Sequence, residues 1–469
     1  MRRIMGLGAG LAILVMAVVS ARPAAAASPS PDITFGRPAA SITYGTGIEF
    51  SVVVELGAPV ERAELLLRFP ATPGPLLIPV DTPSGPSAVL RYTLAEADGH
   101  ILPNTRIEAT WRLWTEGDGG TVTSPTIAVT YADDRFTWQT IDGSIVHVHW
   151  VTGPQSFGER ALSIAEQGIE KAESLLGVTE TEPVDFFIYP DQDSFYQALG
   201  PATRENVGGE ADPDIRTLFA LITPDEIDAA WVGTVIPHEL THLVFDTAVR
   251  NPYHFPPRWL NEGLAVYLSA GYQDSDRQLV RAAVADGTLL PLPALSGQFP
   301  TSQDGFYLAY AESVSSLDFL IRTYGQSALV ALVASYADGK TDDEAFQAAL
   351  GVDVAGFDAA WFADVGATVP AAIGPRPDPL GPLPSGWTGP GGTSGASPGP
   401  NGPSGPGPGG GGSGSQVPAA GVSDALPWLG LGSLGVGVAL AAVAWVRRRR
   451  ASSMTATGPD VGASEPPDR

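Results

Sequence analysis

The chain contains 469 residues, carries a formal net charge of −25 and has no cysteine. Its length accommodates two ordinary domains and further segments. The acidic balance argues against nucleic acid or an anionic surface as a partner. The absence of cysteine excludes structural disulfides, thiol catalysis and cysteine-bound metals.

The first 27 residues have the pattern of an export signal. Two arginines follow the initiating methionine, residues 7–19 are apolar, and the alanines at 24–27 provide small residues for a signal peptidase. The apolar run is short for a membrane span. We therefore expect residues 1–27 to be a signal peptide that is removed on export.

The C-terminal end has the pattern of a tethered membrane anchor. Residues 373–424 are rich in Pro, Gly and Ser and cannot bury a core, so they should form a disordered linker. Residues 425–446 are apolar and long enough to span a bilayer, and four arginines follow them. The sequence predicts one transmembrane helix, a cytoplasmic tail at 447–469, and N-terminal domains on the outer side of the cell membrane.

Residues 32–133 show short alternating apolar runs separated by Gly, Pro and Asp turns. Strands at this spacing predict a β-sandwich of the immunoglobulin or fibronectin type III kind. No cluster of catalytic residue types occurs in it, and we expect it to support the next domain rather than to bind a partner of its own. The predicted strands are 48–54, 63–69, 88–92, 107–114 and 126–131.

The segment 134–372 is predicted to be an α+β domain. Strands are expected to pair around Asp142-Gly143, and a helix at 157–176 and a strand at 184–189 follow. His147 and His149 alternate on one strand face without further metal-binding residue types nearby, so we interpret them as sheet residues.

The stretch His238-Glu239-Leu240-Thr241-His242 carries the strongest chemical signal in the chain. Two histidines four residues apart on a helix project from one face and can reach one Zn²⁺. Glu239 lies one step round the helix, where it can accept a proton from a water that the ion activates. A catalytic zinc requires a third protein ligand, and Glu262, twenty residues further on, can supply it.

Glu262 lies in the setting Trp259-Leu260-Asn261-Glu262-Gly263. Together the two segments resemble the gluzincin zinc metallopeptidases, and most closely the bacterial peptidase MA-like family, over about residues 135–365. The resemblance implies hydrolysis of a peptide or protein substrate, one catalytic Zn²⁺, a general base at Glu239, and the metal ligands His238, His242 and Glu262. It also implies that Asn261 positions the site by hydrogen bonding.

In gluzincins an edge strand upstream of the zinc helix binds the substrate backbone, and the predicted strand 217–223 has the right place for this role. An ordinary strand inside the sheet is the alternative. The zinc helix itself is predicted from about 228 to 249, and Pro237 requires that the helix either starts near this residue or bends there. Asp246 could orient an imidazole as a hydrogen-bond partner, or it could be a solvated helix residue.

The remainder of this domain is predicted to be helical, at 258–270, 305–324, 327–336, 342–350 and 357–362. Peptide hydrolysis builds an oxyanion that a protein donor usually stabilises. No histidine follows His254, so the donor is expected to be a tyrosine. Tyr310 matches the family pattern best, and Tyr307, one turn earlier, is the second candidate; both could instead be core aromatics.

The aminopeptidase-specific pattern Gly-x-Met-Glu-Asn is absent, and Gly208-Gly209-Glu210 is a poor substitute for it. This favours an endopeptidase over an aminopeptidase. The leading hypothesis is therefore a membrane-anchored, extracytoplasmic zinc metallopeptidase. A catalytically silent surface protein that uses a peptidase-like fold for binding or adhesion is the alternative, and metal analysis together with a cleavage assay distinguishes the two.

Overall fold

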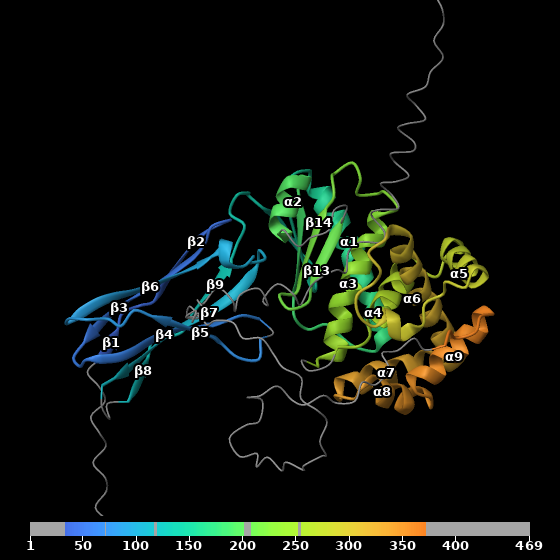
Figure 1. Ribbon diagram of the computed structural model, residues 1–469. Helices are drawn as coiled ribbons and strands as arrows, with labels where there is room; N and C mark the ends of the chain where they lie inside the picture. Colours follow the sequence, from blue (N-terminus) through green and yellow to red (C-terminus); the bar gives the residue numbers. More distant parts are fainter. Residues whose placement is uncertain (1–32, 71, 117–119, 201–207, 252–254, 372–469) are drawn as a thin grey trace, which may run out of the picture.

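The computed structural model describes residues 33–70, 72–116, 120–200, 208–251 and 255–371. The predicted signal peptide, Pro/Gly/Ser-rich linker, transmembrane helix and cytoplasmic tail lie outside these residues. Figure 1 shows an N-terminal β domain at the left, a mixed sheet with helices in the centre, and a group of helices at the right.

The N-terminal domain consists of two antiparallel sheets, as the alternating pattern predicted. All five predicted strands are present, and the two sheets enclose one apolar core with Trp111 and Phe50 at its centre. Burial alternates along β7 because successive side chains of a strand point to opposite faces. The first sheet contains β1 (Ile33–Phe35), β2 (Ala39–Thr43), β3 (Gly47–Leu56) and β6 (Ser87–Ala95); the second contains β4 (Val60–Arg68), β5 (Leu76–Val80), β7 (Thr105–Thr115), β8 (Thr121–Thr123) and β9 (Ile127–Tyr131); a 3-10 helix, η1 (Glu96–Asp98), follows β6.

The second domain is built on a five-stranded mixed sheet. The strand order is β10 (Gln139–Asp142), β11 (Val146–Trp150), β12 (Val184–Tyr189), β14 (Thr217–Leu221) and β13 (Gly209–Asp212). The three central strands run parallel to one another, and the two edge strands pair antiparallel to them. The predicted pairing around Asp142-Gly143 is confirmed by the β10–β11 hairpin.

The structure decides between the two alternatives for the strand predicted at 217–223. β14, at the position predicted for the edge, lies between β12 and β13, and four of its five residues are buried. The strand at the edge is β13. It was not predicted, because its sequence is rich in Gly and Asp. Of the two alternatives, the ordinary sheet strand therefore describes β14.

Helices cover one face of this sheet and continue into a helical half. α1 (Gln155–Leu176) and α3 (Val232–Val249) pack against each other and share one apolar core with the buried side of the sheet. The predicted helices of the second half are present, whereas α2 and α5 were not predicted. The remaining elements are α2 (Gln192–Leu199), α4 (Arg258–Ser269), α5 (Asp274–Asp286), η2 (Leu292–Leu295), α6 (Gln303–Tyr324), α7 (Gln326–Ala337), α8 (Asp342–Leu350) and α9 (Val354–Val365).

Within the described residues, no single helix has the length and apolar composition needed to cross a membrane. The consecutive helices α6 and α7 meet that criterion only as a pair, and the chain bends by 115° between them.

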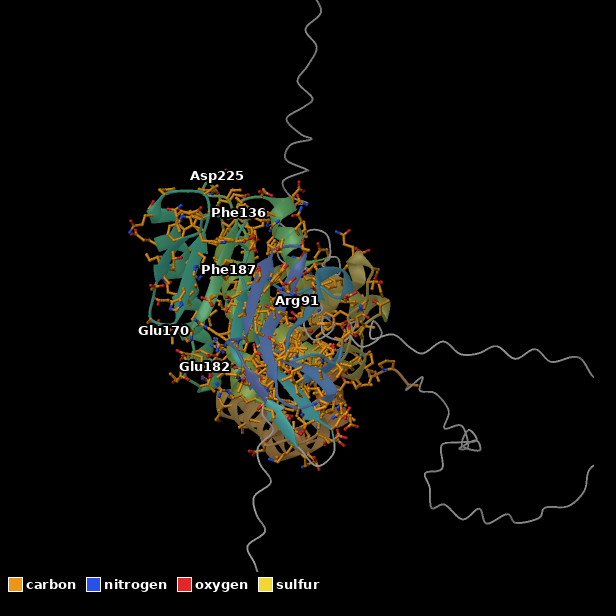
Figure 2. The ribbon with its side chains drawn as sticks, turned by 90° about the vertical axis from the view of Figure 1, so that its left-hand side faces the viewer. Arg91, Phe136, Glu170, Glu182, Phe187 and Asp225 are labelled. Atoms are coloured by element: carbon orange, nitrogen blue, oxygen red, sulfur yellow. The ribbon has the colours of Figure 1, made fainter. Side chains whose placement is uncertain are left out.

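The opposite face of the mixed sheet carries an aromatic cluster that joins the two domains. Tyr189, Phe195 and Phe219 are fully buried there, and Leu102 from the sandwich packs against them. The ring of Trp138, in the connection between the domains, meets Tyr189 edge-on at 5.2 Å. Figure 2, viewed from the sandwich side, shows Phe136 and Phe187 along this junction. The β-sandwich therefore packs directly against the mixed sheet of the second domain.

Hydrogen bonds extend the docking from the sandwich to the sheet. The Asn104 amide donates to Asp185 of β12 at 2.8 Å and to Thr217 of β14 at 2.9 Å. His100 lies between the Glu96 carboxylate of its own domain and the Ala198 carbonyl of α2. Both partners are acceptors, so both ring nitrogens must donate, which requires the charged imidazolium. Burial works against this charge, but the bonds to Glu96 and Ala198 raise the pKa of His100 above its ordinary value.

Candidate metal centre and active site

The helix that carries the pentapeptide begins at Val232, four residues later than predicted, and passes through Pro237 without ending. Pro237 has no N–H to donate to the preceding turn. Helix α1 approaches closely at this point, since a Cβ on Gly168 would lie 3.1 Å from the Cα of Pro237. The Pro237 carbonyl accepts a hydrogen bond from Thr241 at 2.7 Å. Tertiary packing thus keeps His238, the next residue, inside a continuous helix.

His238 and His242 project from α3 toward Glu262 on α4. Their Nε2 atoms lie 3.6 and 3.8 Å from Oε2 of Glu262. All three side chains are buried, with exposed fractions of 2%, 2% and 0%. The ligand atoms of a tetrahedral zinc, each about 2.0–2.1 Å from the ion, are separated by roughly 3.3 Å. The observed distances between the ligand atoms are therefore only slightly longer than those around a bound zinc ion.

Two of these ligand atoms have no hydrogen-bond partner although they are buried. Nε2 of His242 and Oε2 of Glu262 point toward each other and toward the centre of the cluster. Buried polar atoms are almost always paired, and a divalent cation is a partner that both lone pairs can share. Among the described residues, this is the one His/Cys/Asp/Glu group with metal-binding geometry. His147 and His149 do not join such a group and face Asp185 within the sheet, as expected.

The protonation states agree with metal binding. Burial lowers the pKa of His242 to about 4, so its imidazole is neutral at neutral pH, which is the form that binds a metal. Burial alone would raise the pKa of Glu262, but His238, His242 and Arg258 outweigh this effect and lower it. The carboxylate is therefore ionised.

Asn261 fixes the orientation of the second histidine. Its side-chain oxygen lies 2.8 Å from Nδ1 of His242. This bond assigns the proton to Nδ1 and leaves Nε2 to face the cluster. The expected hydrogen-bonding role of Asn261 is thereby confirmed. Asp246 makes no such bond to either imidazole, and the proposal that it orients one of them was wrong.

Glu239 is buried beside the cluster and is held by the edge strand. The backbone N–H of Ala211 in β13 donates to its Oε2 at 3.2 Å. Burial and the nearby carboxylates of Glu262 and Glu210 raise its pKa well above the ordinary range, against the effect of the Ala211 bond. A carboxylate of raised pKa is suited to accept a proton and return it.

Of the two tyrosines, Tyr310 lies at the site. Its ring centre is 6.4 Å from that of His238, and it is 4% exposed. Burial and the Glu262 carboxylate, to which it is hydrogen-bonded, raise its pKa well above the ordinary value, so the hydroxyl keeps its proton. Tyr307 is only partly buried and packs on the outside of the core. The structure thus places the first candidate near the metal ligands.

The direction of the Glu210 side chain follows from its position in β13. Gly209 faces α3, because a Cβ there would lie 3.4 Å from Cγ of Glu239, and side chains alternate along a strand. Glu210 therefore projects to the opposite face, beside His100. Burial and Asp212 raise its pKa to about 7. Sequence reasoning missed this strand, although its position just before the apolar strand β14 was a usable signal.

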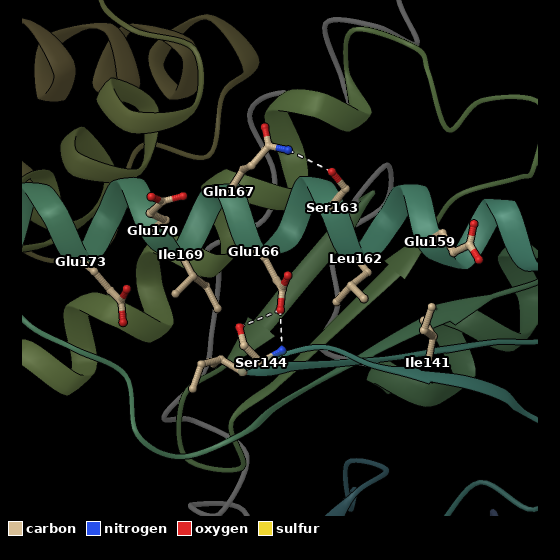
Figure 3. A pocket seen from close by; sticks show the side chains of 11 residues that line it. Ile141, Ser144, Glu159, Leu162, Ser163, Glu166, Gln167, Ile169, Glu170 and Glu173 are labelled. Carbon is tan, nitrogen blue, oxygen red and sulfur yellow. Dashed lines mark hydrogen bonds between the residues drawn. The ribbon is translucent and has the colours of Figure 1, made fainter.

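A separate hollow of about 540 Å³ lies between α1 and the β10–β11 hairpin. Figure 3 shows that Glu166 reaches across to Ser144, whose N–H and hydroxyl donate to it at 2.6 and 2.8 Å. Glutamates from three further turns of α1 line the same hollow. None of the metal-cluster residues lines it, and Glu166 serves to attach the hairpin to the helix.

Comparison with known proteins agrees with this geometry. Residues 164–367 match the model of the Peptidase MA superfamily, and this segment contains the histidines, Glu239, Glu262 and Tyr310. This domain belongs to the peptidase MA superfamily. A search of curated proteins finds no match.

Several solved structures resemble the chain at low sequence identity. An aminopeptidase N family protein from Idiomarina loihiensis shares 13% identity over 71% of this chain and 76% of its own, with a TM-score of 0.36. An M1 zinc metallopeptidase from Deinococcus radiodurans shares 14% identity over 72% of this chain and 93% of its own, with a TM-score of 0.34. The chain spans 60% of yeast LTA4 hydrolase, at 13% identity over 64% of this chain and a TM-score of 0.33.

Glycine is required at position 263 in this peptidase MA domain because α4 and α6 touch there. A Cβ on Gly263 would lie 2.6 Å from the Ser313 carbonyl oxygen, a backbone atom of the helix that carries Tyr310. We expect Gly263→Ala to lower the free energy of unfolding by about 1–3 kcal/mol, the usual cost of overpacking, as measured by denaturant titration. Gly233→Ala, on α3 with nothing within 4 Å of the added methyl, is the matched control and should be neutral or stabilising. Equal effects of the two substitutions would contradict the packing argument.

Proposed function

We propose that this chain is an extracytoplasmic, membrane-anchored zinc metallopeptidase that cleaves within peptide chains. The observation that carries the proposal is the convergence of His238, His242 and Glu262 beside the buried carboxylate of Glu239. A ligand set of two histidines and one glutamate leaves a coordination position for water or substrate, which is the arrangement of a catalytic zinc.

The residues present fit such an ion, and each has a distinct task. A zinc ion bound here would act as a Lewis acid toward the scissile carbonyl and lower the pKa of water. Glu239 accepts the proton of the attacking water and delivers it to the leaving amine. The N–H of Ala211 holds the Glu239 carboxylate in place for this transfer. The protonated Tyr310 hydroxyl donates to the oxyanion as it develops.

Cleavage within chains is favoured by the direction of Glu210. An aminopeptidase needs an anionic group at the cleft to bind the substrate amine. The Glu210 side chain projects from the face of β13 opposite to the one that Gly209 turns toward Glu239, which is not the direction of such a group. Among the described residues β13 is the last strand of the sheet, and its outer edge can instead pair with an extended peptide on both sides of the scissile bond.

We expect the segment from residue 28 to residue 372 to bind one zinc per chain and to cleave an N-acetylated, internally quenched peptide library. Glu239→Gln should lower the cleavage rate by at least roughly 10²- to 10⁴-fold, because it removes the general base, while the zinc content stays unchanged. Zinc analysis and fluorescence kinetics measure both quantities.

Zinc without cleavage of any peptide would instead support the silent binding protein. Cleavage of free but not of acetylated peptides would convert the proposal into an aminopeptidase.

We expect Tyr310→Phe to lower kcat by roughly 10²- to 10³-fold, the usual effect of removing one oxyanion donor, with a much smaller change in KM. Steady-state kinetics on one cleaved library peptide separate the two constants. Tyr307→Phe is the matched control and should leave kcat unaltered. If Tyr310→Phe keeps the kcat of the unmodified chain, Tyr310 has no part in the mechanism.

The location of the protein is a proposal that rests on its two ends, outside the described residues. The export pattern of residues 1–27 and the apolar run at 425–446 with its following arginines motivate it. We expect protease added to intact cells to release the peptidase domain from the membrane fraction by cutting the linker at 373–424. Immunoblotting of the two fractions measures this, and full protection of the domain would contradict the proposed orientation.

A further inference from the structure

Arg258 is a mostly buried cation in direct contact with the carboxylate of the proposed metal ligand Glu262. Its side chain is 15% exposed, and its Nε donates to Oε1 of Glu262 at 3.2 Å. Its backbone N–H donates to the Ser296 carbonyl at 3.0 Å, and its guanidinium carbon lies 4.7 Å from the centre of the Phe299 ring. The segment after α5 thus holds both the backbone and the charged end of this residue.

The two oxygens of Glu262 consequently face different groups. Oε1 accepts the hydrogen bond of Arg258, whereas Oε2 faces His238 and His242. A carboxylate can bind a divalent cation through one oxygen or through both. With Oε1 engaged by Arg258, a single oxygen remains for the ion, and its direction is set before the ion arrives.

Helix stability does not explain an arginine at this position. Arg258 is the first residue of α4, where the helix dipole favours anions over cations. The basic residue also precedes the acidic one in this i,i+4 pair, which is the less favourable order. A locally disfavoured residue at a mostly buried position indicates that Arg258 serves the site.

Phe299 connects this contact with the other side of the centre. Its ring is 1% exposed and meets the ring of Tyr310 edge-on at 5.3 Å. The guanidinium, Phe299 and Tyr310 therefore form one packed row behind the metal ligands. A substitution of Arg258 therefore removes a hydrogen bond to Glu262 and a contact with the Phe299 ring.

We propose that Arg258 is a positioning residue of the metal centre, which holds Oε1 of Glu262 so that only Oε2 is presented to the ion. This inference rests on the proposed metal-binding function of the three ligands. In this role Arg258 acts through its hydrogen bond to Glu262.

The zinc affinity of the full chain, purified in detergent and stripped of metal, tests this role. Arg258→Met keeps the apolar stem and removes the donor, and we expect zinc to bind about 10- to 100-fold more weakly, the usual effect of losing a partner behind a metal ligand. Arg258→Gln keeps an N–H donor without the charge and should retain most of the affinity. Competition with a chromophoric chelator measures all three dissociation constants.

Cobalt(II) provides a readout that does not depend on activity or on stability. Its visible absorption reports the number and geometry of its ligands, and we expect Arg258→Met to change the spectrum because the released carboxylate can bind through both oxygens. Arg258→Gln should keep the spectrum of the unmodified chain. Arg258→Lys, which keeps the charge but moves the donor, replaces Arg258→Met in this comparison if the latter fails to fold.

Arg277→Met is the matched control. Arg277 also stacks on an aromatic ring, 3.9 Å from the centre of Tyr272, but it touches no metal ligand, so zinc affinity and the cobalt spectrum should stay unchanged. Equal zinc affinity and an unaltered cobalt spectrum in Arg258→Met would overturn the inference while the proposed function stands. So would equal losses in Arg258→Met and Arg258→Gln, since charge and not direction would then matter. Absence of zinc binding in the unmodified chain would overturn the proposed function itself.

Discussion

The structure of the second domain depends on holding two carboxylates and two imidazoles in an interior almost without water. Burying an unpaired carboxylate costs several kcal/mol, and Glu239 and Glu262 are 1% and 0% exposed. Local hydrogen bonds offset part of this cost. The backbone N–H of Ala211 donates to Glu239, and the Arg258 side chain donates to Glu262. A divalent cation would complete this compensation, because it pairs the atoms that the protein leaves without a partner.

This requirement explains why the surrounding helices approach so closely. α1 meets α3 at Gly168, and α6 meets α4 at Gly263, in both cases at a distance that a Cβ would disturb. The two ligand-bearing helices are thereby held from their outer sides, by α1 and by α6. The docked sandwich supports the sheet from its other face through Asn104 and the aromatic cluster. The edge strand that holds Glu239 is part of that same sheet.

The sequence predicted that His238, His242 and Glu262 come together, and the structure brings them within 4.8 Å of one another. Helical spacing alone brings His238 and His242 to one face, whereas Glu262 was chosen from its distance after His242 and from the resemblance of its setting to the gluzincins. The edge strand could not be placed in this way, since strand order is decided by pairing partners distant in sequence. The composition of β14 did indicate an inner strand. Leu218, Phe219 and Ala220 form an uninterrupted apolar run, which is typical of a strand covered on both faces and not of an edge strand.

The hydrogen-bond partners of the proposed ligands could not be predicted from local sequence patterns, for a different reason. Asp246, one turn after His242, has the correct helical spacing, yet the imidazole bonds Asn261 from the neighbouring helix. The choice between the two is made by how α3 and α4 pack, which no periodicity encodes. Arg258 illustrates the converse: its spacing from Glu262 was visible in the sequence, but as an exposed i,i+4 pair it would contribute little. The pair differs from an exposed one because the Arg258 side chain is 15% exposed and stacks on Phe299, and because the Glu262 carboxylate that it bonds is fully buried.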